Sequence, residues 1–187
     1  DFESAKKKQL RGNIYLAKVT RVEPSLQAAF VDFGGNRHGF LAFSEIHPDY
    51  YQLPQSDREA LIAEASASGR SVDDEDDEID EDDDGESRSR SNSLKKYKIQ
   101  EVIRRRQIML VQAVKEERGT KGAALTTYLS LAGRYCVLMP NTPSGGGISR
   151  KITNAADRKR LKMIVTDLNV PEGMGLIVRT AGAKRTK

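Results

Sequence analysis

The sequence predicts a mainly β protein, with a small closed barrel in the larger, N-terminal part of its 187 residues and a mixed α+β part after it. Two observations lead to this prediction. Five short segments rich in apolar and β-branched residues are separated by turn-forming residues, which is typical of short strands. A helical spacing of apolar residues is clear only near the C-terminal end.

The five expected strands divide into an N-terminal meander of three and a later pair. The first ends before Pro24, the second ends at the turn Gly34-Gly35-Asn36, and the last two are joined by the charged segment 115–122. The five-stranded OB-fold closes such strands into a barrel without a long open edge. It is expected at residues 12–131, after a lead-in of residues 1–11. The expected strands are residues 13–22, 27–33, 38–43, 107–114 and 123–131.

A long connection, residues 47–106, separates the third strand from the fourth, and a compact barrel does not need it. Within this insertion, residues 57–67 favour a short helix, and residues 98–106 lead back into the barrel. Residues 71–93 are predicted to be disordered, because the run from Asp73 to Glu86 holds 12 acidic residues and almost no apolar side chain.

This acidic run hides a strongly basic remainder. The chain has a formal net charge of +4, but residues 71–93 hold 12 of its 27 acidic residues and two of its 31 basic ones, which leaves a surplus of 14 positive charges elsewhere. Such a surplus attracts nucleic acid, although it also serves plain solubility. The acidic run is interpreted either as an electrostatic competitor for the basic face or as an inert solvated tether.

A smaller α+β unit is expected at residues 132–187. Residues 135–139 and 175–180 have the composition of strands, and a loop rich in Pro, Gly and Ser precedes a helix between them. Thr153 or Asn154 can cap that helix at its N-terminus. The apolar stripe of the helix consists of Leu161, Ile164, Val165 and Leu168.

The single cysteine, Cys136, excludes an internal disulfide and a site built from several thiolates, which favours a reducing compartment. Residues 1–10 lack the apolar core of a signal peptide, and no apolar run is long enough to cross a bilayer. These features predict a soluble, cytoplasmic protein without a membrane segment.

Aromatic residues gather around the turn between the second and third expected strands. Phe30, Phe33 and Phe40 flank Gly34-Gly35, with His38 beside them. Flat rings on an OB sheet can stack on bases of any identity, whereas the alternative for each ring is packing in the core. Positive side chains on neighbouring strands and turns favour binding, and they are Lys18, Arg21, Arg37, Lys115 and Lys121.

Three blocks of the sequence resemble the ribonuclease E/G family. The first contains Gly12-Asn13-Ile14-Tyr15, the stretch from Val22 to Asp32 and Arg37-His38-Gly39-Phe40-Leu41. The second runs from Lys115 to Thr127 and continues with residues 131–135 and 138–141, and the third consists of residues 146–152 and 171–182. Together they cover nearly the whole chain apart from its first residues and the insertion.

The resemblance implies an S1-type RNA-binding barrel, interrupted in this chain by the long acidic insertion, followed by part of a 5'-sensor domain. In similar proteins the residues matching Phe30, Phe40 and Lys121 contact single-stranded RNA. Phe33, Arg37, His38 and Lys115 complete the RNA-binding set predicted for this chain.

The resemblance also implies a pocket for a 5'-terminal monophosphate. Its ligands would be an arginine and a threonine that match Arg179 and Thr180, with the backbone around Gly133 and Val137 shaping the pocket. An arginine offers a planar fork to phosphate oxygens, and a threonine adds a hydroxyl donor.

The family cleaves RNA with Mg²⁺ held by paired aspartates in a later domain, and its subunits are linked through cysteines that share Zn²⁺. No matching aspartate pair or cysteine motif is found here, so no catalytic or metal-binding residue is assigned and no cofactor is expected in this chain. The sequence therefore predicts an inactive RNA-binding and 5'-sensing fragment of a bacterial endoribonuclease of RNA processing and mRNA decay.

For the full-length parent, the resemblance implies a homotetramer that serves as an RNA-degradosome scaffold, without specificity for DNA. Two alternatives to a nuclease fragment remain open. One is a free-standing OB-fold module that binds RNA without any nuclease activity, and the other is a protein-interaction scaffold that works through its acidic loop.

Overall fold

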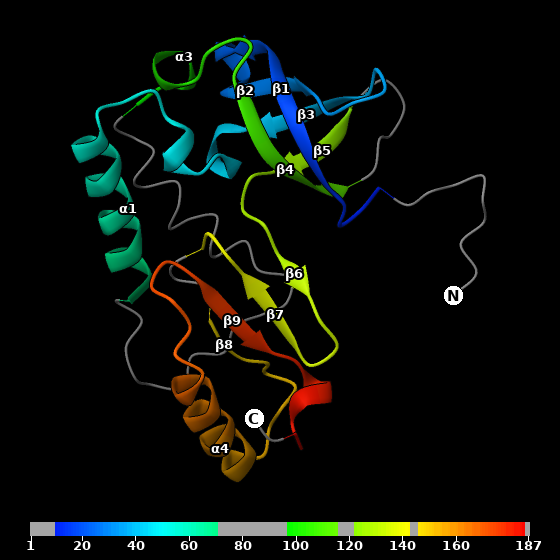
Figure 1. Ribbon diagram of the computed structural model, residues 1–187, viewed down its shortest axis with the longest axis vertical. Coiled ribbons are helices and arrows are strands. Elements are labelled where there is room, and N and C mark those ends of the chain that lie inside the picture. Colours follow the sequence, from blue (N-terminus) through cyan, green and yellow to red (C-terminus); the bar gives the residue numbers. More distant parts are fainter. Residues whose placement is uncertain (1–9, 71–96, 116–121, 143–145, 186–187) are drawn as a thin grey trace. The chain divides into compact units, whose positions relative to one another are not determined.

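The computed structural model describes residues 10–70, 97–115, 122–142 and 146–185. The chain divides into two compact units, which are coloured along the sequence in Figure 1. The barrel unit contains the chain up to Arg58 together with Leu94–Tyr128, and the second unit contains Glu59–Ser93 and Leu129–Lys187.

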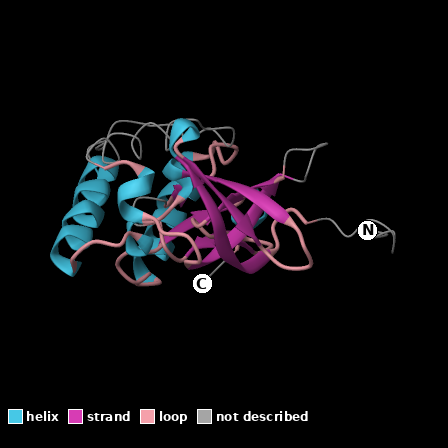
Figure 2. Cartoon of the chain, turned by 90° about the horizontal axis from the view of Figure 1, so that it is seen from above, coloured by secondary structure: helices cyan, strands magenta, loops and turns pink. Residues whose placement is uncertain are grey.

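The barrel unit is a closed five-stranded barrel, as the sequence predicts for an OB-fold. Its strands follow the order β1-β2-β3-β5-β4 around the barrel, and all neighbours are antiparallel except β3 and β5, which pair in parallel. In Figure 2 the strands are magenta and the helices are cyan. The strands are β1 (Ile14–Glu23), β2 (Ala28–Asp32), β3 (His38–Ala42), β4 (Ile108–Lys115) and β5 (Ala123–Thr126).

Alternation along the strands fills the barrel, because successive side chains point to opposite faces. The interior side chains are apolar and small to medium in size, and they include Ala17, Val19, Val31, Leu41, Met109, Val111 and Leu125. The parallel contact of β3 with β5 is unusually close. A Cβ atom at Gly39 would lie 2.3 Å from Leu125 Cδ1, and a Cβ atom at Gly122 would lie 2.3 Å from the His38 carbonyl oxygen. Glycine at these two positions allows the barrel to close.

Two helices of the predicted insertion are described. Helix α1 (Gln55–Arg70) confirms the helix expected at residues 57–67 and is longer at both ends. The short helix α3 (Ile99–Val102) lies within residues 98–106, which were expected only to lead back to β4, and it buries Ile99 and Val102. The acidic run and the whole segment expected to be disordered, residues 71–93, lie outside the described residues.

The part of the second unit that follows the barrel in sequence is described as a four-stranded sheet with the helix α4. The sheet order is β6-β7-β9-β8, with β8 parallel to β9, and the strands are β6 (Leu131–Ala132), β7 (Cys136–Met139), β8 (Gly147–Ile148) and β9 (Gly175–Val178). The prediction of one strand at residues 123–131 was wrong, because β5 ends at Thr126 and Leu131 begins β6 in the other sheet. The expected strand at residues 175–180 ends at Val178.

Helix α4 (Ala155–Asp167) confirms the predicted helix of this unit. Asn154 caps it, with its side-chain oxygen accepting a hydrogen bond of 3.0 Å from the Asp157 backbone N–H. Leu161 packs with Ile152 and Val178, and Ile164 and Val165 join this cluster. Leu168, the last member of the predicted stripe, is exposed. No described helix is long and apolar enough to cross a membrane.

Candidate nucleic-acid interface

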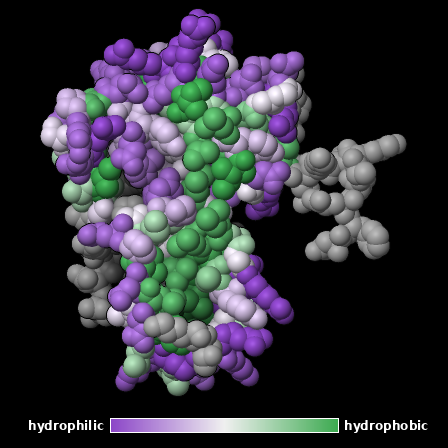
Figure 3. Space-filling view, in the orientation of Figure 1, coloured by the Kyte–Doolittle hydropathy of each residue, from purple (hydrophilic) through white to green (hydrophobic). Residues whose placement is uncertain are grey.

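The outer surface of the barrel has two sectors of different chemistry. Exposed apolar side chains cover the sector between β1 and β4, where Leu16 is 66% exposed and Ile14, Ile108 and Leu110 lie around it. Figure 3 shows a green, hydrophobic area on the barrel unit. Aromatic and cationic side chains cover the sector formed by β1, β2 and β3, and this second sector is the candidate interface.

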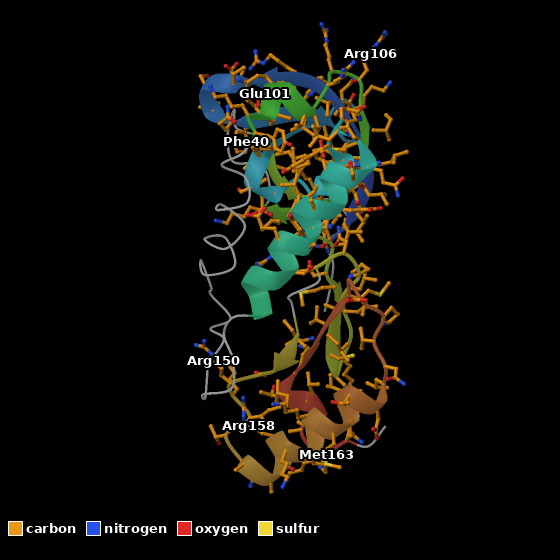
Figure 4. All side chains as sticks on the ribbon, turned by 90° about the vertical axis from the view of Figure 1, so that its left-hand side faces the viewer. Phe40, Glu101, Arg106, Arg150, Arg158 and Met163 are labelled. Atoms are coloured by element: carbon orange, nitrogen blue, oxygen red, sulfur yellow. The ribbon has the colours of Figure 1, made fainter. Side chains whose placement is uncertain are left out.

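Phe30 and Phe40 form the centre of the interface. They are direct cross-strand partners between β2 and β3, and their ring centroids lie 5.8 Å apart at an interplanar angle of 71°. This edge-to-face arrangement is favourable for aromatic pairs. Both side chains are only half-buried, so each ring keeps surface that a base can contact. Figure 4 labels Phe40.

A β-bulge brings Arg21 opposite Phe30. The register between β1 and β2 shifts between Val19 and Arg21, and Arg21 rather than Thr20 then pairs with Phe30. The Arg21 guanidinium carbon lies 4.8 Å from the Phe30 ring centroid, a cation–π distance. The Thr20 hydroxyl donates a 2.9 Å hydrogen bond to the Phe30 carbonyl and fixes the bulge.

Arg21 remains available to an anion. Among the described residues its one ion-pair contact, to Glu23, is at the 4.0 Å limit, and 66% of its side chain is exposed. Such a pair contributes little in water. A guanidinium that stacks on Phe30 and has exposed N–H groups can therefore donate hydrogen bonds to a phosphate.

Phe33 and Arg37 form a separate cluster with Tyr15. Phe33 is only 3% exposed, and its ring lies 5.1 Å from the Tyr15 ring. The Arg37 guanidinium carbon lies 5.0 Å from each of these two rings, and Arg37 Nε donates to the Gly34 carbonyl at 2.9 Å. Phe33 is thus a core residue whose face does not reach a ligand in this conformation, and Arg37 is held over the core by the turn.

The other residues of the predicted RNA-binding set lie at the margins of the interface. His38 is exposed at the start of β3, opposite Asp32. Asp32 is itself engaged, because its carboxylate accepts a 2.8 Å hydrogen bond from the Gly34 N–H. Lys115 is exposed at the end of β4, opposite Ala124. Lys121 lies outside the described residues.

The second unit brings part of the predicted phosphate-binding set together. Arg179 Nη1 donates a 2.8 Å hydrogen bond to the Gly133 carbonyl oxygen, and Thr180 follows Arg179 on an exposed turn. Val137 lies on β7 opposite Ile177. The Gly133 N–H is not available to a ligand, because it donates to the Cys136 carbonyl at 2.8 Å.

Two further arginines lie over the ring of Tyr135, and neither was assigned to the pocket from the sequence. The guanidinium carbons of Arg134 and Arg185 lie 5.6 and 5.1 Å from the Tyr135 ring centroid. The Tyr135 carbonyl oxygen accepts a 2.8 Å hydrogen bond from the Arg179 backbone N–H. The Tyr135 ring therefore lies beside two cationic side chains, one from its sequence neighbour Arg134 and one from the distant Arg185.

In residues 10–70, 97–115, 122–142 and 146–185, no three His, Cys, Asp or Glu side chains come close enough to hold an ion. The Mg²⁺ and Zn²⁺ that the resemblance implies are assigned to the parent protein and not to residues of this chain. Cys136, half-buried on β7, is a free thiol.

The fold and the aromatic–cationic sector are those of the OB-fold barrels, a class that commonly binds oligonucleotides. Over residues 130–187 the chain matches the model of the ribonuclease E/G family. It is 46% identical over 186 residues to ribonuclease E of Escherichia coli K12, which covers 100% of this chain and 14% of that protein. Ribonuclease E of Haemophilus influenzae is 44% identical and is covered to 16% of its length.

A more distant relative is ribonuclease G of Escherichia coli K12, at 35% identity over 96% of this chain and 30% of that protein. The chain belongs to the ribonuclease E/G family. The chain spans 14% of the length of the Escherichia coli ribonuclease E to which it is similar.

Proposed function

We propose that this chain is the RNA-binding and 5'-end-sensing part of a ribonuclease of the E type, and that single-stranded RNA lies across the outer face of β1, β2 and β3. The observation that carries the proposal is the cross-strand row of Phe40, Phe30 and Arg21 on a closed OB barrel. The names of the relatives support RNA as the ligand.

The chemistry of the row favours single strands. Rings that lie on a sheet can stack only on bases that are not already stacked within a duplex, and every base offers a face for such contact. A cation beside the rings follows the phosphate backbone. The basic remainder of the chain, with its surplus of 14 positive charges, adds a long-range attraction.

The second unit is proposed to hold the 5'-terminal monophosphate. Arg179 supplies a guanidinium whose position is fixed by the bond to Gly133, and the Thr180 hydroxyl is the next donor along the chain. Arg134 and Arg185 add positive charge around Tyr135. Val137 lies on the neighbouring strand of the same sheet.

The wider activity belongs to the parent protein. RNA cleavage with Mg²⁺, Zn²⁺-linked homotetramers, a role as a degradosome scaffold in the bacterial cytoplasm and the lack of DNA specificity are proposed for it by resemblance. The chain alone is proposed to bind RNA without cleaving it. The second candidate is a stand-alone OB-fold module that binds RNA with no nuclease attached.

Replacing Phe30 or Phe40 by Ala tests the barrel interface. Each variant is expected to weaken binding of a fluorescent uridine dodecamer by about 1–3 kcal/mol, because one stacking platform is lost. Fluorescence anisotropy gives the affinity, and circular dichroism of the same samples gives the folded fraction. The matched control is Phe43→Ala, a core ring that is 5% exposed, which should lower stability and leave the affinity of the folded fraction unchanged. If Phe30→Ala and Phe40→Ala behave like this control, the barrel face does not bind RNA.

The same assay tests the 5'-end proposal. The unaltered chain should bind a dodecamer with a 5'-monophosphate more tightly than one with a 5'-hydroxyl, and Arg179→Gln should abolish that preference by removing a charged phosphate donor. Affinity for the 5'-hydroxyl form should not change. Equal preference ratios for the two proteins would remove Arg179 from the proposed pocket.

A further inference from the structure

The three consecutive arginines Arg104, Arg105 and Arg106 form an exposed turn immediately before β4. Its backbone is defined by a hydrogen bond of 3.3 Å from the Gln107 N–H to the Arg104 carbonyl, which closes a four-residue β-turn. The Gln107 side chain anchors the turn, since its Oε1 accepts from the Arg104 N–H at 3.2 Å and its amide donates to the Tyr50 carbonyl.

This arginine turn (Arg104–Arg106) is attached to the strand that carries Arg21. The Arg106 N–H donates to the Val19 carbonyl at 2.8 Å, and the Val19 N–H donates to the Gln107 carbonyl at 2.9 Å. Val19 lies on β1 directly before the bulge that turns Arg21 toward Phe30. Strand β1 thus has Phe30 on one side and the arginine turn on the other.

A line across the strands therefore runs from Phe40 to Phe30, then to Arg21, and then to the arginine turn. Neighbouring strands lie about 4.8 Å apart, so this line continues the proposed RNA path by one further strand spacing. In Figure 4 the Arg106 side chain lies at the top of the barrel unit and points away from the barrel.

The arginines of this turn are available to a ligand. All three are exposed, and no ion pair or cation–π contact is found for them in the part of the chain that the structure describes. The acidic side chain next to them in sequence, Glu101, is occupied by its 2.7 Å hydrogen bond from the Lys98 N–H.

The backbone of Arg106 has a conformation that residues other than glycine rarely adopt. Arg106 has φ +71°, in the left-handed region, at the third position of the turn. Glycine is the usual residue there, because a side chain in this conformation is strained. A strained non-glycine residue in a sound fold suggests that its side chain has a function.

We infer that the arginine turn is a phosphate-binding site that extends the RNA path beyond the Phe30–Phe40 platform, so that it holds the backbone of a longer single strand. The inference rests on the proposed function of the barrel face. Arg21 stacks on Phe30 and receives the phosphate beside the platform, and the turn receives the next ones along the strand. Contacts of arginine with phosphates position the RNA backbone and carry no base preference.

The test compares two RNA lengths and two matched variants of the full chain. The first variant, Arg104→Gln/Arg105→Gln/Arg106→Gly, removes the charges of the turn. The control, Lys159→Gln/Lys162→Gln/Lys184→Gln, removes as many charges from exposed positions of the second unit. The probes are a uridine tetramer and a uridine dodecamer, both with a 5'-hydroxyl end, and binding is measured by anisotropy across a salt series.

The turn variant is expected to bind the dodecamer about tenfold more weakly or worse at low salt, and to lower the slope of log affinity against log salt by about 2 for three lost contacts. Its affinity for the tetramer should change by less than about twofold, because the platform alone holds that length. The control should bind both probes with the affinity of the unaltered chain, once the weaker general attraction caused by its lower net charge is allowed for.

Arg106→Gly alone separates binding from folding. It should raise the midpoint of urea unfolding, because glycine relieves the left-handed strain, and it should still weaken dodecamer binding. A loss of affinity in a more stable protein cannot come from unfolding.

If the turn variant and the control bind the dodecamer equally while the Phe30→Ala variant is impaired, the arginine turn has no role and the barrel proposal stands. If the unaltered chain binds neither RNA, both proposals fail. If a poly-glutamate peptide loses affinity in the turn variant and the dodecamer does not, the turn binds acidic protein segments and the inference is overturned.

Discussion

At the scale of single residues, Gly39 shows how closely the barrel is packed. It lies on β3 opposite Ala123 of β5, where a Cβ atom would lie 2.3 Å from Leu125 Cδ1 and 3.1 Å from the Ala123 carbonyl oxygen. Leu125 is buried, so it has little freedom to move away.

Gly39→Ala is expected to destabilise the barrel by about 1–3 kcal/mol, because one methyl group is forced into a filled core. Urea unfolding measures the change. Gly146→Ala is the matched control, since a Cβ atom there would make ordinary contacts of 3.5 Å, and it should shift stability by less than about 0.5 kcal/mol. The packing argument is wrong if the two variants are equally stable.

At the scale of elements, the segment between β3 and α1 is fixed by a polar network. The Thr127 hydroxyl donates to the Glu45 carbonyl at 2.7 Å and accepts from the His47 N–H at 2.7 Å. The Thr126 hydroxyl donates to the Glu45 carboxylate at 2.6 Å. Through these bonds the turns Phe43–Glu45 and Pro48–Tyr50 are held against the end of β5.

The buried imidazole of His47 makes this segment sensitive to pH. Burial lowers the pKa of His47, and the nearby Asp49 carboxylate opposes that effect only in part. His47 Nδ1 accepts a 3.1 Å hydrogen bond from the Asp49 N–H, so it carries no proton, and its 3.5 Å approach to Asp49 Oδ2 is not an ion pair in this state. The Tyr128 ring, 5.6 Å away, covers the imidazole.

The barrel is therefore expected to lose stability as the pH falls below 6.5, the ordinary pKa of histidine. Around this pH the unfolded chain takes up a proton at His47, whereas the folded chain does so only at lower pH. Where the unfolded state binds more protons than the folded state, the free energy of unfolding decreases as the pH falls. A tenfold difference in proton affinity corresponds to about 1.4 kcal/mol. Unfolding midpoints in urea between pH 7 and pH 5 measure the loss.

The control for this prediction is His47→Asn, whose side-chain oxygen can still accept from the Asp49 N–H but does not titrate. Its stability should depend less on pH than that of the unaltered chain over the same interval. Parallel pH profiles would show that other groups cause the dependence.

At the scale of the whole molecule, charge is distributed unevenly along the chain. The run Asp73–Glu86 is acidic, whereas the chain outside residues 71–93 has 14 more basic than acidic residues. The run lies outside the described residues, and in the sequence it connects α1 to α3. A tether of this kind can raise the effective concentration of a charged segment at the surface to which it is attached, here the barrel face. The run is proposed to compete with RNA for the cations there.

Deleting residues 71–93 should then tighten binding of the uridine dodecamer at low ionic strength. The gain should fade as salt is added, because screening weakens the attraction between the run and the barrel. A replacement of the same length in Ser and Gly separates charge from chain length. Superimposable salt curves for the intact, deleted and replaced chains would identify the run as an inert tether.

Much of the architecture followed from local patterns. Alternating apolar residues located the five barrel strands, and the spacing of Leu161, Ile164 and Val165 located α4 behind its Asn154 cap, because these signals depend only on neighbours in sequence. The family could be predicted as well, since it rests on contiguous blocks of residues.

Contacts between distant segments were decided by the tertiary structure. Sequence alternation did not show the bulge that moves Arg21 opposite Phe30, or the ring packing that buries Phe33 against Tyr15. The parallel closure of β3 on β5 and the short strands β6 and β8 depend on partners far along the chain. Sequence determined the longer strands and helices, because periodicity is local. Tertiary structure determined which side chains meet, because register and burial depend on where those elements pack.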